Sequence, residues 1–317
     1  MKTKIILFLT ILIGAFTVSC SDKYIADDAG QFLRTNHQKI EVKVGERFVL
    51  TPMYDSEATA AKQYTWSVLD SGIASVSSGT NNTGIVEGIA LGKTVIEIQS
   101  NDKELAFYVD VEVTNDTPVV RILAIGNSFS EDAIENYLYD LATAGGHNVI
   151  IGNMYIGGSG LSLHWENASE GKPDYQFRKI ERNGIMNRMD NWSIYQALTS
   201  ENWDYVSFQE VSQLSGLMEG YEEYLPQLVD FANRFATNPD MKIIFHQTWA
   251  YAEDSNHEGF YNYNRDQLQM YNAIVDAVNK TNEKGFIDLV VPSGTAIQNG
   301  RTSYLGDKFT RDGYHLD

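Results

Sequence analysis

The carboxyl-terminal two thirds of the chain alternates between short apolar runs and longer amphipathic stretches. Residues 221–236 and 263–282 place apolar side chains at helical spacing and predict two long amphipathic helices. Residues 160–202 contain no clear strand and are expected to form an excursion beside a site. Five apolar runs rich in β-branched residues predict buried strands at 119–125, 149–155, 205–208, 243–246 and 289–291. This alternation predicts a parallel sheet with right-handed crossovers and helices on both faces.

The amino-terminal part follows a different pattern, in which short alternating segments are separated by Gly, Asn and Asp. They predict strands at 40–44, 48–50, 64–68, 73–76, 84–88, 94–98 and 105–113. This spacing predicts an antiparallel, all-β sandwich over residues 36–115, with Trp66 in its core. Trp66-Ser-Val, Gly84–Gly88 and the final strand resemble bacterial Ig-like domains of group 2. The resemblance implies a spacer or adhesion module, joined by a linker at residues 115–118 to a second domain at 118–317.

The first twenty residues have the pattern of an export signal. A basic start, Met1–Lys4, precedes an apolar run and Ser19-Cys20, which predicts a signal peptide over residues 1–19. The segment before Cys20 resembles the bacterial lipobox, so Cys20 is expected to carry the lipid; an ordinary signal peptide is the alternative. Residues 20–35 are then expected to be a polar tether. Because Cys20 is the only cysteine, the sequence offers no disulfide framework and no cysteine-based metal site.

The negative net charge of the chain limits the kinds of molecule that it is expected to bind. The full chain carries a formal charge of −18, and removing residues 1–19 takes away two lysines and no acids, which leaves −20. Such a balance argues against nucleic acid and anionic lipid surfaces as partners. A neutral substrate such as a polysaccharide or oligosaccharide fits it better. The predicted location is the bacterial cell envelope, with a lipid on Cys20 as the membrane contact.

The first strand of the second domain leads into a turn that carries a serine. Gly126 ends the strand, and Ser130 with the acids after it predicts a helix start. The helix is expected to end at Gly145-Gly146. Ser128 therefore lies at the carboxyl end of a strand, where open α/β sheets bind ligands. It is a candidate nucleophile.

Candidate partners for this serine follow other strands or lie near the end of the chain. The glycines of 157–160 follow the second strand, where backbone N–H groups can approach a ligand closely. Gln209 follows the third strand and offers a side-chain amide. Asp312 lies three residues before His315, which predicts a histidine base held by a carboxylate. Glu210, beside Gln209, is a weaker candidate for a general acid.

This set, in this order, resembles the SGNH (GDSL-like) hydrolase superfamily over residues 119–317. The resemblance implies a flavodoxin-like, three-layer α/β/α domain with a parallel sheet. It also implies that Ser128 is the nucleophile, His315 the general base and Asp312 the group that orients the histidine. No cofactor and no metal are implied.

The resemblance also implies an oxyanion hole and shows departures from the family pattern. The Ser128 N–H, the Gly158 N–H (Gly160 is the other candidate) and the Gln209 amide would bind the oxyanion. Gln209 replaces the usual Asn, and Asn127 stands where many relatives have Asp. The chain stops at Asp317, where relatives continue into a helix, so we expect a truncated domain whose His315 is weakly held.

More narrowly, several segments look like one branch of the superfamily that is common in Bacteroidota. They are Ile125–Ser130, Tyr155–Gly160, His164–Asn167, His246–Trp249 and Pro292–Asn299. Candidate substrate-binding residues within them are Asn127, His164, His246 and Trp249. Histidines such as His164 and His246 are more often packed or hydrogen-bonded than ligands, and His246 is the candidate for the pocket because it too ends a strand. Trp165, Trp192 and Trp249 predict a sugar-stacking surface or, alternatively, core.

The sequence therefore predicts a lipid-anchored, SGNH-type serine esterase that removes acetyl or other acyl groups from glycans. A second hypothesis is a catalytically silent glycan-binding lipoprotein that uses the same pocket. A third is a metal-dependent hydrolase using Asp312, His315 and His246, for which the sequence offers no tight ligand cluster.

Overall fold

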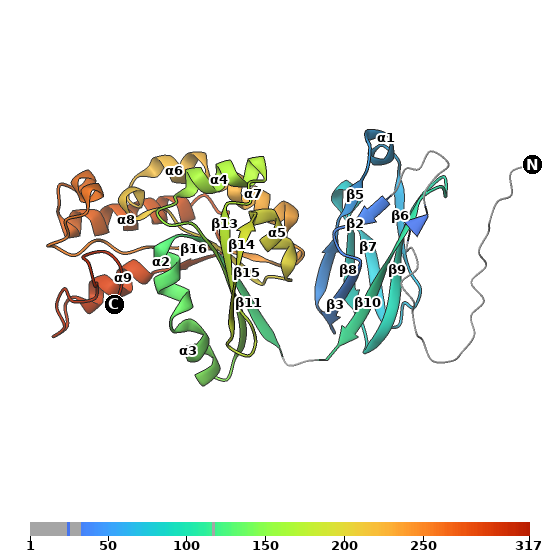
Figure 1. Ribbon diagram of the computed structural model, residues 1–317, viewed down its shortest axis with the longest axis horizontal. Helices are drawn as coiled ribbons and strands as arrows, with labels where there is room; N and C mark the ends of the chain where they lie inside the picture. Colours follow the sequence, from blue (N-terminus) through green and yellow to red (C-terminus); the bar gives the residue numbers. More distant parts are fainter. Residues whose placement is uncertain (1–23, 26–32, 116–117) are drawn as a thin grey trace, which may run out of the picture.

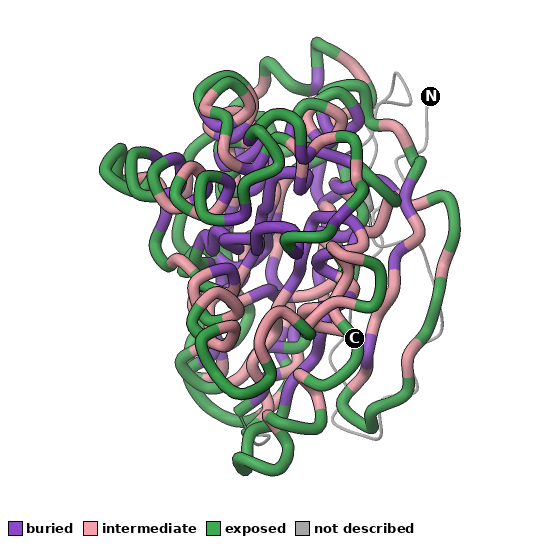
Figure 2. Tube along the Cα trace, turned by 90° about the vertical axis from the view of Figure 1, so that its left-hand side faces the viewer, coloured by how far each residue is buried: buried purple, intermediate pink, exposed green. Residues whose placement is uncertain are grey.

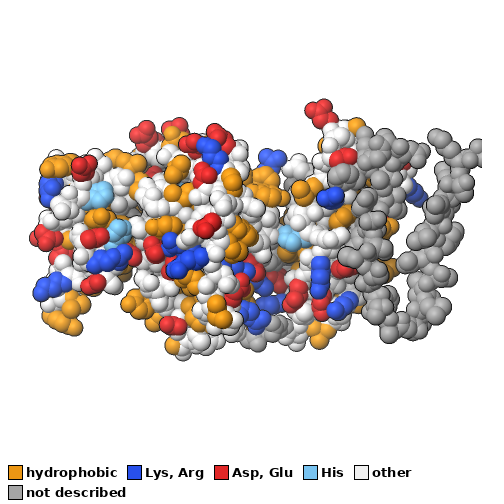
Figure 3. All heavy atoms as spheres, viewed as in Figure 1, with side chains coloured by type: hydrophobic (Ala, Val, Ile, Leu, Met, Phe, Trp, Pro, Cys, Tyr) orange, Lys and Arg blue, Asp and Glu red, His pale blue; other side chains and the backbone are white. Residues whose placement is uncertain are grey.

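The computed structural model describes residues 24–25, 33–115 and 118–317, and it divides into an all-β domain and an α/β domain (Figure 1). The predicted signal peptide and Cys20 lie outside the described residues. Within the described part of the chain, no helix combines the length and the hydropathy needed to cross a membrane. On the face drawn in Figure 3, acidic and basic side chains are interspersed over both domains.

The amino-terminal domain is the predicted β-sandwich. Its larger sheet has the order β1-β10-β9-β6 with β3 beside β10, and a smaller sheet has the order β4-β8-β7. The elements are β1 (Tyr24–Ile25), β2 (Leu33–Thr35), β3 (Lys39–Lys43), β4 (Arg47–Leu50), β5 (Pro52–Tyr54), α1 (Glu57–Ala60), β6 (Tyr64–Val68), β7 (Ala74–Ser78), η1 (Thr80–Asn82), β8 (Gly84–Gly88), β9 (Gly92–Ser100) and β10 (Ala106–Thr114). The pairs are antiparallel except β3 with β10, which is parallel.

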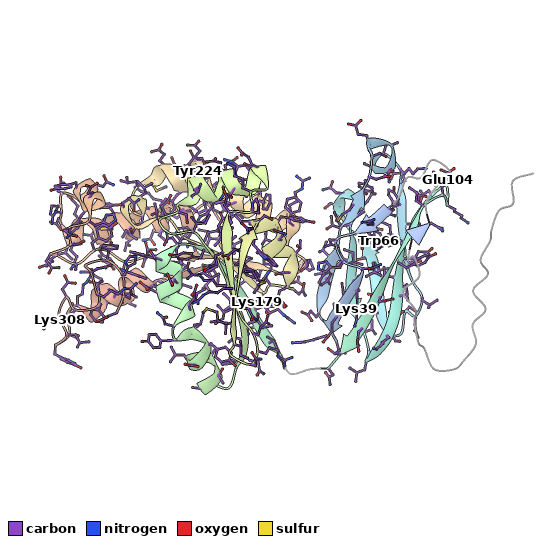
Figure 4. The ribbon with its side chains drawn as sticks, viewed as in Figure 1. Lys39, Trp66, Glu104, Lys179, Tyr224 and Lys308 are labelled. Atoms are coloured by element: carbon purple, nitrogen blue, oxygen red, sulfur yellow. The ribbon has the colours of Figure 1, made fainter. Side chains whose placement is uncertain are left out.

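Besides the parallel pair β3–β10 and the pairing of β1 within the predicted tether, further details of this domain differ from the prediction. Trp66 does not fill the core but covers its edge, where it is partly buried and its Nε1 donates to the Asn82 carbonyl at 2.8 Å (Figure 4). The indole lies over Gly84, where a Cβ would come within 2.6 Å of the ring. Leu33–Thr35, assigned to the tether, instead pairs with β5, and Leu33 is fully buried. Burial of that leucine explains why the domain begins before residue 36.

The second domain is built on a seven-stranded sheet in the order β14-β13-β12-β11-β15-β16-β17. Its strands are β11 (Val119–Gly126), β12 (Asn148–Tyr155), β13 (Tyr175–Ile180), β14 (Met186–Trp192), β15 (Tyr205–Phe208), β16 (Lys242–His246) and β17 (Leu289–Val291). The five predicted strands are confirmed and run parallel. Region 160–202, however, contains an antiparallel hairpin of β13 and β14. β14 shows no apolar alternation because it is an edge strand with polar, exposed residues on both faces, whereas β13 does alternate through Tyr175 and Phe177 and was overlooked.

Helices cover both faces of this sheet (Figure 1). Helices α4 to α8 lie along one face, and α2, α3 and α9 lie on the other. The elements are α2 (Ser128–Ser130), η2 (Glu131–Glu135), α3 (Leu138–Ala144), α4 (Leu161–Glu170), α5 (Ile194–Ser200), η3 (Ser212–Leu214), α6 (Met218–Glu223), α7 (Leu225–Phe235), η4 (Glu258–Tyr263), α8 (Gln267–Asn282) and α9 (Ser293–Gly300). Figure 2 shows the buried positions concentrated along the central strands and the helix sides that face them. The three-layer α/β/α architecture is therefore confirmed.

The predicted helices are more broken than their apolar spacing indicated. The helix after β11 begins at Ser128, with Asn127 as its N-cap, and passes through the π-helical turn η2 before α3. Ser130 does not cap it but donates a hydrogen bond to the Asn127 carbonyl. The predicted helix 221–236 is divided at Tyr224, directly before Leu225-Pro226, because proline favours a first helical turn.

The two domains touch at the end of the sheet that is far from Ser128. Arg121, near the start of β11, pairs with Glu46 at 3.0 Å, and both side chains are largely buried. The Asn202 amide also donates to Glu46 at 2.9 Å. Because Ser128 follows the other end of β11, the Ig-like domain contributes no residue to the site described below.

Candidate active site

The structure brings together the three residues predicted to perform acyl transfer. Ser128 Oγ lies 2.8 Å from His315 Nε2, and His315 Nδ1 lies 2.7 Å from the Asp312 carboxylate. Since the carboxylate accepts, Nδ1 carries the proton, and the unprotonated Nε2 accepts from the Ser128 hydroxyl. A serine, a base and a group that orients the base thus form one hydrogen-bonded line.

The Asp312 carboxylate is held in its ionised form by its own loop. Burial acts to raise its pKa, but hydrogen bonds from the His315 N–H, the His315 ring and the Tyr314 N–H outweigh burial. Together they hold the pKa of Asp312 below its ordinary value. The side chain is therefore a carboxylate at neutral pH, which favours one orientation and one tautomer of His315.

The loop carrying His315 was expected to be weakly held, but the structure anchors it at several points. Thr310 and Leu316 form an antiparallel bridge across its base. The Gly313 carbonyl accepts from the Ala252 N–H at 2.8 Å. Asp132, on the segment after the nucleophile, accepts hydrogen bonds from the Arg311 guanidinium at 3.1 Å and from the Leu316 N–H at 2.9 Å. The contacts made by the described residues alone thus fix both flanks of the Asp312–His315 segment.

Trp249 contributes to this anchoring rather than to a sugar-stacking surface. Its indole is fully buried, stacks on Phe129 at 4.3 Å and donates from Nε1 to the Tyr314 carbonyl at 2.7 Å. Trp165 and Trp192 pack against the hydrophobic core instead of lining the active-site pocket. Core packing, the alternative weighed for these tryptophans, is what the structure contains.

A pocket of about 150 Å³ opens beside Ser128 and His315. Its wall comprises Asn127, Ser128, Phe129, Gly158, Val211, Ser212, Gln213, His257, Tyr314 and His315. Gly158 has a φ of +69°, a conformation that side chains with a Cβ rarely adopt, so its backbone can face the pocket directly. Gly160, the other oxyanion candidate, does not line the pocket, and a Cβ there would meet the Glu210 carboxylate.

Gln209 does not occupy the predicted oxyanion position. Its Nε2 donates to Asn127 Oδ1 at 2.8 Å, and its Oε1 accepts from His246 Nδ1 at 2.8 Å. It lines a separate cavity of about 230 Å³, which also borders α3 and the start of α9. Both ends of the amide thus have buried partners, and Gln209 does not line the pocket at Ser128. His246, expected at the substrate pocket, lines this second cavity instead.

Asn127, Gln209, His246 and His164 belong to one buried polar network beneath the nucleophile. Asn127 caps α2 through the Phe129 N–H and donates from Nδ2 to the Ser159 carbonyl at 2.7 Å. On the side of β13, the network continues through Ser159, His164 and Tyr175. His164 Nε2 lies 3.2 Å from Ser159 Oγ, and His164 Nδ1 lies 2.8 Å from the Tyr175 hydroxyl. The network links the ends of β11, β12, β15 and β16.

The two histidines of this network are neutral. Burial lowers the pKa of His164 to about 3 and that of His246 to about 4. Both are hydrogen-bonded supporting residues, the alternative weighed for them, and neither lines the pocket at Ser128. Asn127 both lines that pocket and belongs to the network.

The sequence did not predict the roles that Glu210 and His257 have in the structure. Glu210 is buried and faces away from the pocket; its Oε1 accepts from the Leu161 N–H at 3.0 Å and the Val211 N–H at 2.7 Å. Burial raises the pKa of Glu210. Glu210 therefore ties the start of α4 to Val211 in the pocket wall rather than acting as a general acid. His257 lies in the pocket wall. No motif in the sequence indicated this position, because the histidine stands alone in a loop.

The residues of the metal hypothesis do not assemble. His246 is hydrogen-bonded to Gln209, whereas Asp312 and His315 face Ser128. Among the described residues, no group of three or more His, Cys, Asp or Glu side chains is arranged to hold a metal ion.

Comparisons with known proteins agree with this division of the chain. Residues 121–317 match the model of a domain of unknown function, DUF4886, and residues 31–111 match the bacterial Ig-like domain of group 2. A search of curated proteins found no match.

Two of the similar solved structures each cover 63% of this chain. A DUF4886 family protein from Bacteroides uniformis is 47% identical, with a TM-score of 0.62, over 63% of this chain and 77% of that chain. A protein from Slackia heliotrinireducens, named as a candidate SGNH hydrolase, is 18% identical, with a TM-score of 0.43, over 63% and 91%.

Proposed function

We propose that this chain, which belongs to the family of the domain of unknown function DUF4886, is a serine esterase that removes acetyl or other small acyl groups from glycans. The observation that carries the proposal is the line of hydrogen bonds from Ser128 through His315 to Asp312, which opens on a pocket. The pocket volume of about 150 Å³ suits a group as small as acetyl, because drug-sized ligands need about 300 Å³ or more.

The reaction follows from the protonation states of these three groups. His315 Nε2 takes the proton of Ser128 as Oγ attacks the ester carbonyl, and Asp312 stabilises the imidazolium that forms. The N–H groups of Ser128 and Gly158 would stabilise the oxyanion. His315 then gives its proton to the leaving alcohol, which leaves an acyl group on Ser128. A water, deprotonated by His315, attacks this ester and releases the carboxylic acid and free Ser128.

The compartment and substrate are proposals that extend this chemistry. The apolar amino-terminal run and Cys20 support a lipid-anchored protein of the bacterial cell envelope, with the Ig-like domain as a spacer. The strongly acidic charge supports a neutral polysaccharide or oligosaccharide carrying acyl esters, rather than nucleic acid. The chemistry described above uses no cofactor.

The direct test is hydrolysis of p-nitrophenyl acetate by the mature chain beside Ser128→Ala and His315→Ala. We expect both substitutions to reduce kcat by at least 10³-fold, because each removes a group that takes part in bond making. Exposed Ser162 and His147 offer matched controls, and Ser162→Ala and His147→Ala should retain wild-type rates. Equal rates in all five proteins would overturn the esterase and favour the silent glycan-binding hypothesis.

A further inference from the structure

The wall of the active-site pocket carries polar side chains that acyl transfer does not use. Ser212, Gln213 and His257 all line it. The Ser212 hydroxyl is engaged by the Tyr251 hydroxyl at 2.7 Å. The imidazole of His257 differs. Its Nδ1 has a hydrogen-bond partner, whereas its Nε2 has none among the described residues.

Backbone geometry determines which nitrogen of His257 carries the proton. Nδ1 accepts a hydrogen bond from the Gly259 N–H at 3.0 Å, at the start of η4. A nitrogen that accepts has no proton, so the neutral ring carries its proton on Nε2. Burial lowers the pKa of His257, and the neighbouring His315 lowers it further, which favours the neutral ring. His257 therefore offers an N–H donor at the distal edge of its ring.

The His257 ring is also held in place by two tyrosines, and one of them, Tyr314, contacts His315 as well. His257 packs against Tyr251 at 4.8 Å and edge-on against Tyr314 at 4.9 Å. Tyr314 contacts His315 as well, with ring centroids 4.4 Å apart. Because His315 must protonate the leaving alcohol, a group that shares Tyr314 with His315 lies next to the alcohol half of the ester.

We infer that His257 is a specificity-determining residue, whose Nε2–H donates a hydrogen bond to a hydroxyl or ring oxygen of the sugar that bears the ester. The inference rests on the proposed esterase function and refines its substrate class to esters of polyhydroxylated alcohols. An alkyl ester offers no oxygen at this place, so binding it would cover the partly exposed Nε2–H without pairing it. Sites built to pair with a substrate hydroxyl reject analogues without it for that reason.

The test compares two acetates of similar size, a mono-acetylated methyl pyranoside and cyclohexyl acetate. The measured quantity is the ratio of kcat/KM for the sugar ester to kcat/KM for the cyclohexyl ester. His257→Phe keeps a planar ring without the donor, and we expect it to lower this ratio about three- to tenfold, the size of one neutral hydrogen bond. His257→Gln carries an amide N–H near the position of Nε2 and should recover most of the ratio.

The outcomes separate this inference from the esterase itself. An unchanged ratio in His257→Phe, or an equal loss in the Gln and Phe variants, would overturn the role of the donor while Ser128-dependent hydrolysis remains. Equal falls on both substrates would also overturn it, because they would place His257 on the ester group instead. If hydrolysis of neither acetate requires Ser128, the esterase function fails, and the inference fails with it.

Discussion

Asp132 connects the helix of the nucleophile to both ends of the loop that carries His315, and its replacement tests how that loop is positioned. Its Oδ1 accepts from two nitrogens of Arg311 at 3.1 Å, and its Oδ2 accepts from the Leu316 N–H at 2.9 Å. The carboxylate is 3% exposed, whereas the Arg311 side chain is 44% exposed. In Asp132→Asn, the amide keeps an oxygen for one partner and turns an NH₂ group toward the other donor.

The magnitude follows from the contact that is lost. A hydrogen bond to a charged group contributes about 1.5–3 kcal/mol, and exposure of Arg311 discounts the ionic part, since surface ion pairs contribute about 0–1 kcal/mol. We therefore expect a loss of about 1–2 kcal/mol in loop positioning, which lowers kcat about 5- to 30-fold. Burial raises the pKa of Asp132, so removing its charge also relieves a desolvation cost. The thermal midpoint should consequently change little.

The assay is steady-state hydrolysis of p-nitrophenyl acetate, with kcat and KM determined separately. Asp140→Asn, an exposed substitution in the following helix, is the matched control and should behave as wild type. Arg311→Met retains the Leu316 hydrogen bond and should show a smaller fall than Asp132→Asn. In a His315→Ala background, Asp132→Asn should have no further effect, because its influence passes through the histidine. A wild-type kcat in Asp132→Asn, or an equal additional fall in the His315→Ala background, would refute the reasoning.

Two further substitutions test the supporting residues. Glu210→Gln keeps an oxygen for both backbone donors but removes the charge. Burial raises the pKa of Glu210 in the folded state above its ordinary value of 4.5. The wild type therefore loses stability as the pH rises from 4.5 through the folded pKa, whereas the variant, which has no charge at this position, does not. Urea unfolding at pH 4, 6 and 8 should therefore shift progressively in favour of Glu210→Gln, and a constant difference would contradict the buried charge. Gln209→Ala should lower the free energy of unfolding by about 1–3 kcal/mol, because it leaves the buried Nδ1–H of His246 unpaired and removes one of the two hydrogen bonds to Asn127 Oδ1. Its kcat should fall less than the roughly 10²–10³-fold that loss of an oxyanion donor costs, so a larger fall would restore Gln209 to the oxyanion hole.

The sheet could be predicted from the sequence because its central strands are buried on both faces. Strands β11, β15 and β16 are near-continuous apolar runs, and such runs are recognisable without any neighbour. The edge strand β14 exposes residues on both faces, so no alternation marks it. The sequence places Trp66 in the core, but its actual position over Gly84 follows only from the packing of the folded domain.

The same distinction holds for the candidate site: residues set by local sequence could be predicted, whereas side-chain directions set by distant residues could not. Ser128 was identifiable because its strand and turn are contiguous, and the spacing of Asp312 and His315 is short. Gln209 was correctly placed at the end of a strand, but the direction of its amide is set by Asn127, which accepts from Nε2, and by His246, which donates to Oε1. Contacts between residues so far apart in the chain leave no trace in the local sequence.

The two carboxylates near His315 have separate tasks because only one of them faces an arginine. The charge of Asp132 is balanced by Arg311, and its oxygens are occupied by the flanks of the loop. Asp312 instead pairs with the His315 ring among the ion pairs of the described residues. The neutral His164 and His246 add no charge beneath Ser128. In the proposed acyl transfer, the imidazolium would therefore be stabilised mainly by Asp312, while Asp132 would fix where that imidazolium lies.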